Sequence, residues 1–313
     1  MPPTSQGREG GVGAGRARVF GMRRIGAIFT PYSPPEALRD AAQAAEDSGV
    51  PELWLWEDCF RESAFAAASA ALAWTTTLKV GIGVAPMPLR NVALTAMEIA
   101  TVERLFPGRL IPGVGHGVLP WMAQVGARVA SPLTLMREYV PALRSLLAGE
   151  EVSTAGRYVT LDQVRLDWPP AQAPAIVVAG EGPKTVRLTG EVGDGTVLPG
   201  GSNPERVART LALALEGRAD AGRGDAHELI VFVSAAFGGD AARAQLADDL
   251  MRWSGSVDPA LMVVGDSAEV AAAIEPFYAA GATSVILQPR EEETDLAGYM
   301  AGVGEVARLI GDR

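Results

Sequence analysis

The sequence has few side chains suited to proton transfer or nucleophilic attack, and the best placed of them directly follow apolar runs. Of the two histidines, His116 follows the run 109–115, whereas His227 precedes the run 229–235. If these runs are parallel strands of a barrel, ligands bind where the strands end. We therefore expect His116 to reach the site as a proton donor and His227 to lie at the surface. A plain turn residue flanked by glycines is the alternative for His116.

Two adjacent carboxylates lie at the end of the run 52–57, of which Glu57 is the last residue and Asp58 the next. Neighbouring strand residues point to opposite faces, so at most one of the two should point into a site. Asp58 is our candidate, with capping of the next helix or closure of the loop as its alternatives. Cys59, the only cysteine, has no base that the sequence places beside it, so we do not expect a thiolate nucleophile.

Two glycine-rich loops have the composition of an anion site. The first, Ala179-Gly180-Glu181-Gly182-Pro183-Lys184, follows the run 175–180 and opens a helical segment. Its glycines allow the backbone close to a ligand, the first helical turn offers free N–H groups and Lys184 adds a positive charge, which together suit a phosphate. The second loop, Pro199-Gly200-Gly201-Ser202-Asn203, can add N–H donors to the same anion. Ordinary helix starts are the alternative, with Asn203 as an N-cap, and Glu181 carries a charge of the wrong sign.

Known metal and nucleophile motifs are absent from the sequence. It contains no HExxH, no paired CxxC, no Walker sequence and no GxSxG elbow, so we expect no metal site. A chain with few acid–base groups at its strand ends but with glycine-rich anion loops indicates that a bound organic cofactor does the chemistry.

The elements that must position these residues alternate in type along the chain. Helical segments rich in Ala, Leu, Glu and Arg separate eight apolar runs, which are 24–30, 52–57, 79–85, 109–115, 175–180, 195–199, 229–235 and 284–288. Runs that are apolar throughout are typical of parallel strands covered on both faces. Eight such units suit an α/β fold of the (β/α)8 TIM-barrel type better than a doubly wound sheet.

Two connections are longer than a barrel requires. The segment 117–174 contains a long helix at 131–148 and an extra hairpin within 151–168, and the segment 238–266 is a second excursion. We expect both insertions at the C-terminal face of the barrel, where the strand-to-helix loops form active sites.

Composition limits the compartment and the partners. The formal charge of −10, from 37 acidic and 27 basic side chains, argues against a nucleic-acid partner. No apolar stretch approaches the roughly 18 to 20 residues of a membrane span. Residues 1–21 are rich in glycine and arginine and nearly free of large apolar side chains, which predicts a flexible tail before one barrel domain at 22–313. We expect a cytoplasmic protein that acts on a small-molecule substrate.

From Arg24 to the C-terminus, the sequence resembles the bacterial luciferase-like family, whose barrels bind FMN or the deazaflavin coenzyme F-420 (hereafter F420). Within that family it is similar to the F420-dependent reductases and dehydrogenases. The matching segments are Leu53-Trp54-Leu55-Trp56-Glu57-Asp58, residues 80–86, residues 96–101, Pro107-Gly108-Arg109 leading into 113–117, and Gly182-Pro183-Lys184 with 188–195.

This resemblance implies an oxidoreductase that transfers a hydride between C5 of F420 and a small organic substrate. The ring would lie across the barrel mouth, backed by a cis peptide between Gly83 and Val84, with its phosphate on the two glycine loops. Asp58 would contact the ring or the ribityl hydroxyls, and His116 would donate the proton. The predicted cofactor-binding residues are Asp58, Gly83, Val84, Gly115, Ala179, Gly180, Glu181, Gly182, Pro183, Lys184, Pro199, Gly200 and Gly201. Trp54, Trp56, Trp121 and Met122 could wall the substrate side, with plain core packing as the alternative for the two strand tryptophans.

Departures from the family pattern keep other functions open. Cys59 stands where several family members have a histidine, and Val118 stands where the sugar-phosphate dehydrogenases have a glutamate. Oxidation of a sugar phosphate is therefore not expected. Glu181 replaces a small residue, so its side chain should turn away from the phosphate. An FMN-dependent luciferase-like monooxygenase is the first alternative, and a non-catalytic flavin-binding barrel is the second. Because family members are commonly dimers, we expect a homodimer.

Overall fold

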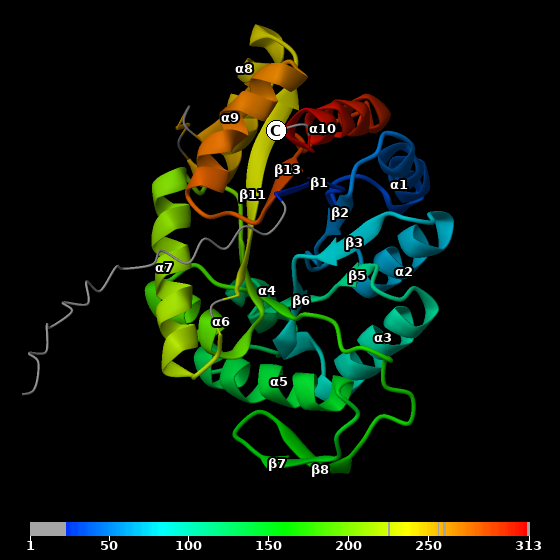
Figure 1. Ribbon diagram of the computed structural model, residues 1–313, viewed down its shortest axis with the longest axis vertical. Helices are drawn as coiled ribbons and strands as arrows, with labels where there is room; N and C mark the ends of the chain where they lie inside the picture. The colour runs from blue at the N-terminus through cyan, green and yellow to red at the C-terminus, as the bar shows by residue number, and fades with distance from the viewer. Residues whose placement is uncertain (1–22, 225, 256, 259–260, 312–313) are drawn as a thin grey trace, which may run out of the picture.

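The structure, a computed structural model, describes residues 23–311 except residues 225, 256 and 259–260. The tail predicted for residues 1–21 lies outside the described residues. The strands form the centre of the molecule and helices surround them (Figure 1). None of the described helices is both long and apolar enough to cross a membrane.

Eight parallel strand positions close into a barrel. The short strands β3 and β4 together form one of these positions, and β5 and β6 form the next. Along the two positions, β3 pairs with β5 and β4 pairs with β6. The ladder runs from β6 through β9, β10, β11, β13, β1 and β2 to β3, and so returns to its start. Each strand position overlaps one predicted run, which confirms the (β/α)8 barrel. The strands are β1 (Arg24–Ile28), β2 (Glu52–Leu55), β3 (Lys79–Ile82), β4 (Ala85–Pro86), β5 (Leu110–Ile111), β6 (Gly113–Gly115), β9 (Val177–Ala179), β10 (Gly195–Leu198), β11 (Glu228–Phe237) and β13 (Ser284–Gln288).

The helices that alternate with the barrel strands bury one face each against the outside of the barrel. The last of them buries Met300, Val303 and Ile310, which follow the helical period. The helices are η1 (Pro35–Ala37), α1 (Leu38–Asp47), α2 (Ala64–Trp74), η2 (Met87–Leu89), α3 (Val92–Leu105), α4 (Leu119–Gln124), α5 (Pro132–Leu147), α6 (Pro183–Val192), α7 (Pro204–Asp220), α8 (Asp240–Ser254), α9 (Ser267–Ala279) and α10 (Leu296–Gly311).

The predicted hairpin exists, but its expected position is wrong. β7 (Val152–Ala155) and β8 (Thr160–Val164) are antiparallel and lie outside α5 (Figure 1). The Glu138 carboxylate on α5 accepts the backbone N–H groups of residues 157–159 at 2.8 to 3.1 Å. The hairpin follows a helix rather than a strand, so it starts from the opposite end of the barrel and packs along α5 instead of at the mouth.

The second insertion does lie at the C-terminal face. It comprises α8 and β12 (Met262–Gly265), which extends the sheet by pairing with the far end of β11. Leu246 and Leu250 of α8 line a cavity at the barrel mouth. This insertion therefore forms part of the wall of that cavity.

Aromatic side chains fill the barrel interior. Trp54 and Phe232 meet edge to face with ring centroids 5.7 Å apart, and branched aliphatic side chains from β1, β9, β10 and β13 complete the cluster. Gly81 makes room for this packing, because a Cβ there would lie 2.3 Å from the indole of Trp54. The interior is a packed core below the mouth rather than a channel.

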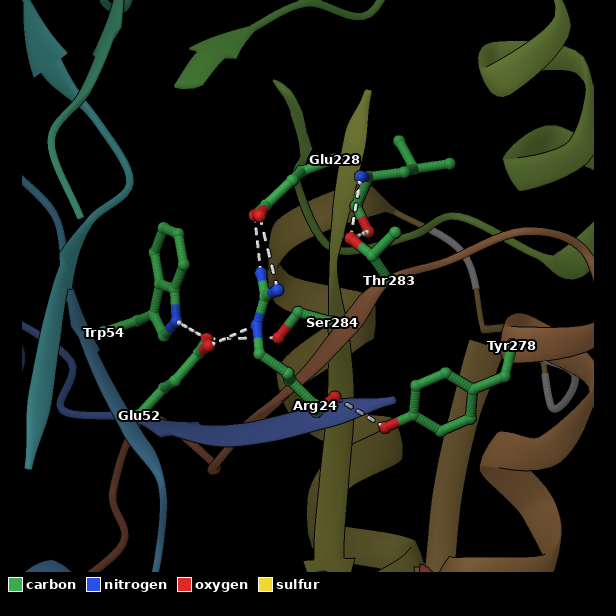
Figure 2. Close-up of polar contacts among 8 residues, drawn as sticks. Arg24, Glu52, Trp54, Glu228, Tyr278, Thr283 and Ser284 are labelled. Carbon is green, nitrogen blue, oxygen red and sulfur yellow. Dashed lines mark hydrogen bonds and ion pairs between the residues drawn. The ribbon is translucent and has the colours of Figure 1, made fainter. Parts of the chain in front are cut away.

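An ion-pair network joins the amino ends of three strands inside the barrel (Figure 2). Arg24 donates from Nε to Glu52 Oε1 at 2.7 Å and from an Nη atom to Glu228 Oε2 at 2.5 Å. The other oxygen of Glu52 accepts Trp54 Nε1 at 2.9 Å and the Ser284 hydroxyl at 3.1 Å. Glu52 is only 1 % exposed, and burial of a carboxylate is tolerated when its oxygens are paired in this way.

Candidate active site

Two adjoining cavities lie at the carboxyl ends of the strands. The inner cavity has a volume of about 270 Å³ and the outer cavity about 330 Å³, and the two share Trp56, Asp58, Val118, Gly200 and Gln288. The inner cavity brings together nine of the predicted catalytic and cofactor-binding residues, which are Asp58, Gly83, Val84, His116, Ala179, Gly180, Glu181, Pro199 and Gly200. The geometry therefore unites both glycine loops with both predicted catalytic side chains.

The inner cavity has a flat apolar floor. Trp56 and Phe232 stack with centroids 6.1 Å apart and planes inclined by 28°. The peptide bond between Gly83 and Val84 is cis, as the family resemblance implied. A Cβ on Gly83 would lie 2.6 Å from the Phe232 ring, so glycine allows this close approach. These surfaces suit an aromatic ring system lying across the mouth.

Gly115 does not line either cavity. It is buried, and a Cβ there would lie 2.7 Å from Val84 Cγ2. Glycine at this position makes room for the Val84 side chain. Gly115 therefore supports Val84, which lines the inner cavity, instead of lining the cavity itself.

Only one of the two adjacent carboxylates is available to a ligand. Glu57 forms a bidentate pair with Arg90, with Arg90 Nη2 at 2.8 Å from Oε2, and it accepts the Ala64 N–H at 3.0 Å. The capping role considered for Asp58 therefore belongs to Glu57. Asp58 lines both cavities, where burial raises its pKa while a hydrogen bond from the Trp56 side chain and the charge of Arg61 oppose the rise.

His116 is half-buried in the wall of the inner cavity. Its Nδ1 lies 3.0 Å from the Gly117 carbonyl oxygen. When Nδ1–H donates to this carbonyl, the neutral ring holds its lone pair on Nε2, so the contact selects a tautomer. Gly117 has φ +66°, a conformation that favours glycine. His116 is thus both a turn residue and a cavity residue.

The two helix starts beside the cavity differ in their capping. The side chain of Asn203 accepts the Arg206 N–H at 2.9 Å, which confirms its predicted alternative role as the N-cap of α7. The N-cap of α6 is Gly182, which has no side chain to accept its N–H groups. Gly182 and Gly201 face open space, since a Cβ on either would meet nothing within 4 Å. An uncapped helix start in open space fits a phosphate group.

Lys184 and Glu181 set the charge of this loop. Both are exposed. The Glu181 carboxylate accepts a hydrogen bond from an Arg206 Nη atom of α7 at 3.1 Å, so its side chain spans the gap between the two helix starts. The loop therefore holds one cation in Lys184 and one ion pair.

The outer cavity combines aromatic and acidic walls. Tyr32 and Trp121 line it together with Trp56, and its charged lining residues are Asp58, Asp249, Asp258 and Glu291. Arg61 stacks on Tyr32 with its guanidinium carbon 3.9 Å from the ring centroid. Burial and the charges of Glu291 and Asp58 raise the pKa of Tyr32 to about 12, so this phenol stays protonated at neutral pH.

Two sequence expectations, for Met122 and His227, are wrong in detail, and Trp54 has the core-packing role that was its alternative. Trp54 and Met122 are fully buried and line neither cavity, whereas Trp56 and Trp121 do wall the site as predicted. His227 is only 4 % exposed, because the turn before β11 places its Nε2 2.8 Å from the Thr196 hydroxyl. Burial, with the charges of Arg218 and Arg223, lowers its pKa to about 4.

Sequence reasoning missed other residues of the mouth. Tyr32, Phe232 and Gln288 line the cavities. Gln288 ends β13 and Tyr32 follows β1, so the rule that identified Asp58 and His116 would have found both if it had been applied to every strand. Phe232 lies inside the predicted run 229–235 and inside β11, so the same rule would have missed it. Within the described part of the chain, no group of three or more His, Cys, Asp and Glu side chains is arranged to hold a metal ion.

The closed parallel barrel, the flat floor of its mouth and the uncapped helix start beside it define a (β/α)8 barrel of the cofactor-binding class. Sequence comparison gives the particular group. The family described as luciferase-like monooxygenase matches residues 16–282. The chain therefore belongs to the luciferase-like family.

Curated relatives cover most of the chain. A 5,10-methylenetetrahydromethanopterin reductase of Methanolobus tindarius is 30 % identical over 229 residues, which is 72 % of this chain and 69 % of the relative. An F420-dependent glucose-6-phosphate dehydrogenase of Kineococcus radiotolerans is 28 % identical, over 80 % of this chain and 86 % of its own. An F420-dependent hydroxymycolic acid dehydrogenase of Mycobacterium tuberculosis is 30 % identical, over 69 % and 63 %.

Solved structures confirm the fold. The F420-dependent tetrahydromethanopterin reductase of Methanopyrus kandleri has a TM-score of 0.79 at 20 % identity, covering 92 % of this chain and 99 % of its own. An F420-dependent secondary alcohol dehydrogenase has a TM-score of 0.81 at 22 % identity with the same coverage. The monooxygenase RslO1 of Streptomyces bottropensis has 0.78 at 20 % identity, covering 93 % and 100 %. The same barrel thus occurs in F420 enzymes and in a monooxygenase.

Proposed function

We propose that this protein is an oxidoreductase that transfers a hydride between F420 and a small organic substrate. The observation that carries the proposal is the mouth geometry: a flat floor beside an uncapped helix start that fits a phosphate. The relatives that share this sequence include enzymes named as F420-dependent. The protein is expected to work in the cytoplasm.

F420, when bound, supplies a ring carbon that accepts or donates a hydride. Trp56 and Phe232 form the surface on which a flat ring can stack, and Val84 closes the floor beside them. The α6 start and the Pro199–Gly201 turn would hold the phosphate of the cofactor. Holding two reactants at contact distance in a dry site is worth many orders of magnitude in rate.

His116 is the proton carrier of this site in our proposal. Its Nδ1 contact with the Gly117 carbonyl orients the ring and leaves Nε2 for the substrate. Cys59 and Val118 occupy the positions where other family members have proton-transferring groups, so no histidine or glutamate side chain competes for this role there. Asp58, which also lines the inner cavity, would contact the ring or the ribityl hydroxyls of the cofactor.

Equilibrium binding tests this function. Purified protein is titrated with F420 and, separately, with FMN, each oxidised and reduced, and binding is followed by fluorescence. Binding of F420 at least tenfold tighter than FMN, about 1.4 kcal/mol, supports the proposal and leads to a screen of enones, imines and alcohols. A preference for FMN would replace this proposal with the FMN-dependent monooxygenase hypothesis, which oxygen-uptake assays would check. If the protein binds neither cofactor, the proposal is overturned. Tight F420 binding without turnover in that screen would favour the non-catalytic barrel.

The outer cavity disfavours a phosphorylated substrate. Its described lining residues include no cation that could pair with a phosphate, since the charged ones are carboxylates, two of which contact Arg252. Val118 offers no proton-transferring group. We expect no turnover of glucose 6-phosphate, in contrast to the sugar-phosphate dehydrogenases that are similar in sequence. Measurable turnover of that substrate would contradict this part of the proposal.

We also infer that the chain forms a homodimer through α3. Leu94, Met97 and Leu105 are between 46 % and 66 % exposed and share one side of this helix at helical spacing. Burial of such a stripe against a second copy removes apolar surface from water. Light scattering after gel filtration should give a dimer that Met97→Glu dissociates, whereas a monomeric wild type would contradict the inference.

A further inference from the structure

Glu181 is an unexpected charge in the loop that fits the cofactor phosphate. It is the only acidic residue in the two glycine loops, residues 179–184 and 199–203. The side chain lines the inner cavity and is 64 % exposed. It stands directly before Gly182, the residue that leaves the first turn of α6 uncapped. A phosphate bound at that helix start therefore lies beside a carboxylate.

The carboxylate also engages the nearest arginine. Arg206 lies on the first turn of α7, and its guanidinium donates to Glu181 across the gap between the two helix starts at 3.1 Å. An anion that enters this gap can interact with Lys184 and with free N–H groups. The charge of Arg206, in contrast, is already balanced by Glu181. The loop thus offers less positive charge than its arginine and lysine alone would supply.

The two cofactors of this family place different charges in the loop. FMN ends in a phosphate monoester, which loses its second proton at a pKa of about 6 and is largely a dianion at pH 8. F420 carries a phosphodiester, which keeps a single negative charge at every pH above its first ionisation. Since Coulomb repulsion scales with charge, a fixed carboxylate repels the dianion about twice as strongly as the monoanion at equal distance.

We propose that Glu181 is a cofactor-selectivity residue, which disfavours the phosphate monoester of FMN relative to the phosphodiester of F420. Its carboxylate acts directly on the bound phosphate and indirectly by holding Arg206. This inference rests on the proposed function, because it assumes that the phosphate binds at the start of α6.

Four ligands separate the effect of the phosphate from that of the ring. Riboflavin and FMN share a ring and differ by the monoester, while the deazaflavin riboside and F420 share a ring and differ by the phosphodiester and the tail beyond it. The ratio of the two dissociation constants within each pair measures what the phosphate-bearing part contributes. These ratios are measured at pH 8 and pH 5 for the wild type and for Glu181→Gln.

The Gln variant keeps the size of the side chain, removes its charge and releases Arg206. At pH 8 we expect it to tighten FMN at least threefold more than F420 and to leave both phosphate-free ligands unchanged. At pH 5, where FMN is mainly a monoanion, the difference between the two cofactors should disappear. The matched control is Glu205→Gln, which removes another exposed carboxylate, beside Arg206 in the sequence, that lines neither cavity and should leave every ratio unchanged.

Equal tightening of FMN and F420 at pH 8 would overturn the inference, and so would an equal effect of Glu205→Gln. A change in riboflavin binding as large as that in FMN binding would also overturn it, since the effect would then be on the ring. Failure of wild-type protein to bind F420 is a different result: it contradicts the proposed function, while the riboflavin and FMN arm still reports on Glu181.

Discussion

The two ends of the barrel use charged side chains in opposite ways. At the amino end, Glu52 and Glu228 both pair with Arg24. At the mouth, Asp58 and His116 line a cavity. Size does not distinguish the ends, because a hollow of about 700 Å³ lies at the amino end. The pairing of the charges shows which end stabilises the fold and which end is left for a ligand.

One ion pair at the mouth follows the pattern of the amino end. Arg90 binds Glu57 in a bidentate manner and also contacts Glu98 at 3.2 Å. The pair joins the end of β2 to the segment before α3, and it holds the backbone from which Asp58 projects. Paired charge is therefore also part of the site, because Glu57 lines the inner cavity with its oxygens already bonded.

The largest expected effect is on the amino end. Glu52→Ala leaves Arg24, the Trp54 indole and the Ser284 hydroxyl without their buried acceptor, which should cost about 3 kcal/mol of unfolding free energy. Urea denaturation measures the loss. Glu216→Ala is the matched control, because it removes an exposed partner of Arg187 and should cost less than about 1 kcal/mol. F420 affinity of the folded Glu52→Ala protein should match the wild type, and equal losses in the two variants would break the comparison between the ends.

The second effect is on catalysis at the mouth. His116→Gln should lower turnover about 100-fold with a substrate found among the enones, imines and alcohols, because the proton carrier is lost. Its F420 dissociation constant and its urea midpoint should stay near the wild-type values. A variant that kept full turnover, or that lost cofactor affinity and stability together, would remove His116 from the proposed role.

The third effect depends on His227 at the amino end. Its folded pKa of about 4 lies below its ordinary value of 6.5, so the unfolded chain binds more protons between these two pH values. The contribution of His227 to the unfolding free energy is complete above about pH 6.5. It falls as the pH is lowered and is smaller by about 2 kcal/mol at pH 5. His227→Gln should flatten the unfolding free energy between pH 7 and pH 5, as measured by urea unfolding at both pH values. An unchanged slope in this variant would contradict the buried neutral histidine.

The smallest effect is the pH dependence of Asp58. Its folded pKa is raised by burial, so its stabilising contribution is present below its unfolded pKa and is lost as pH rises through the folded value. Asp58→Asn should therefore gain stability relative to the wild type with rising pH, within about 1 kcal/mol because the carboxylate is partly exposed to solvent. Urea unfolding at a series of pH values tests the direction, and a trend of opposite sign would show that Asp58 is paired in the folded state.

Local sequence patterns predicted the strands and the main site residues. Each apolar run became a strand, and the rule that ligands bind at strand ends placed Asp58, His116 and both glycine loops in one cavity. That rule works because the position of a residue relative to its own strand is a local property.

Features that depend on distant segments were not predicted. The contact between Glu181 and Arg206 joins two separate loops, and Glu57 meets Arg90 across 33 residues. The burial of His227 depends on β10 and on the end of α7, which lie beside it only after the barrel closes. The hairpin position likewise followed from the direction of α5 rather than from the composition of the hairpin.

The two cavities of the mouth are built from different parts of the chain. Strand ends and glycine loops build most of the inner cavity, whereas α8, from an insertion, supplies Leu246, Asp249 and Leu250 to the outer one. Mutations in α8 can thus alter the accepted substrate while the barrel and its cofactor contacts persist. For protein engineering, exchange of the segment 238–266 between family members is the most economical route to a new substrate range.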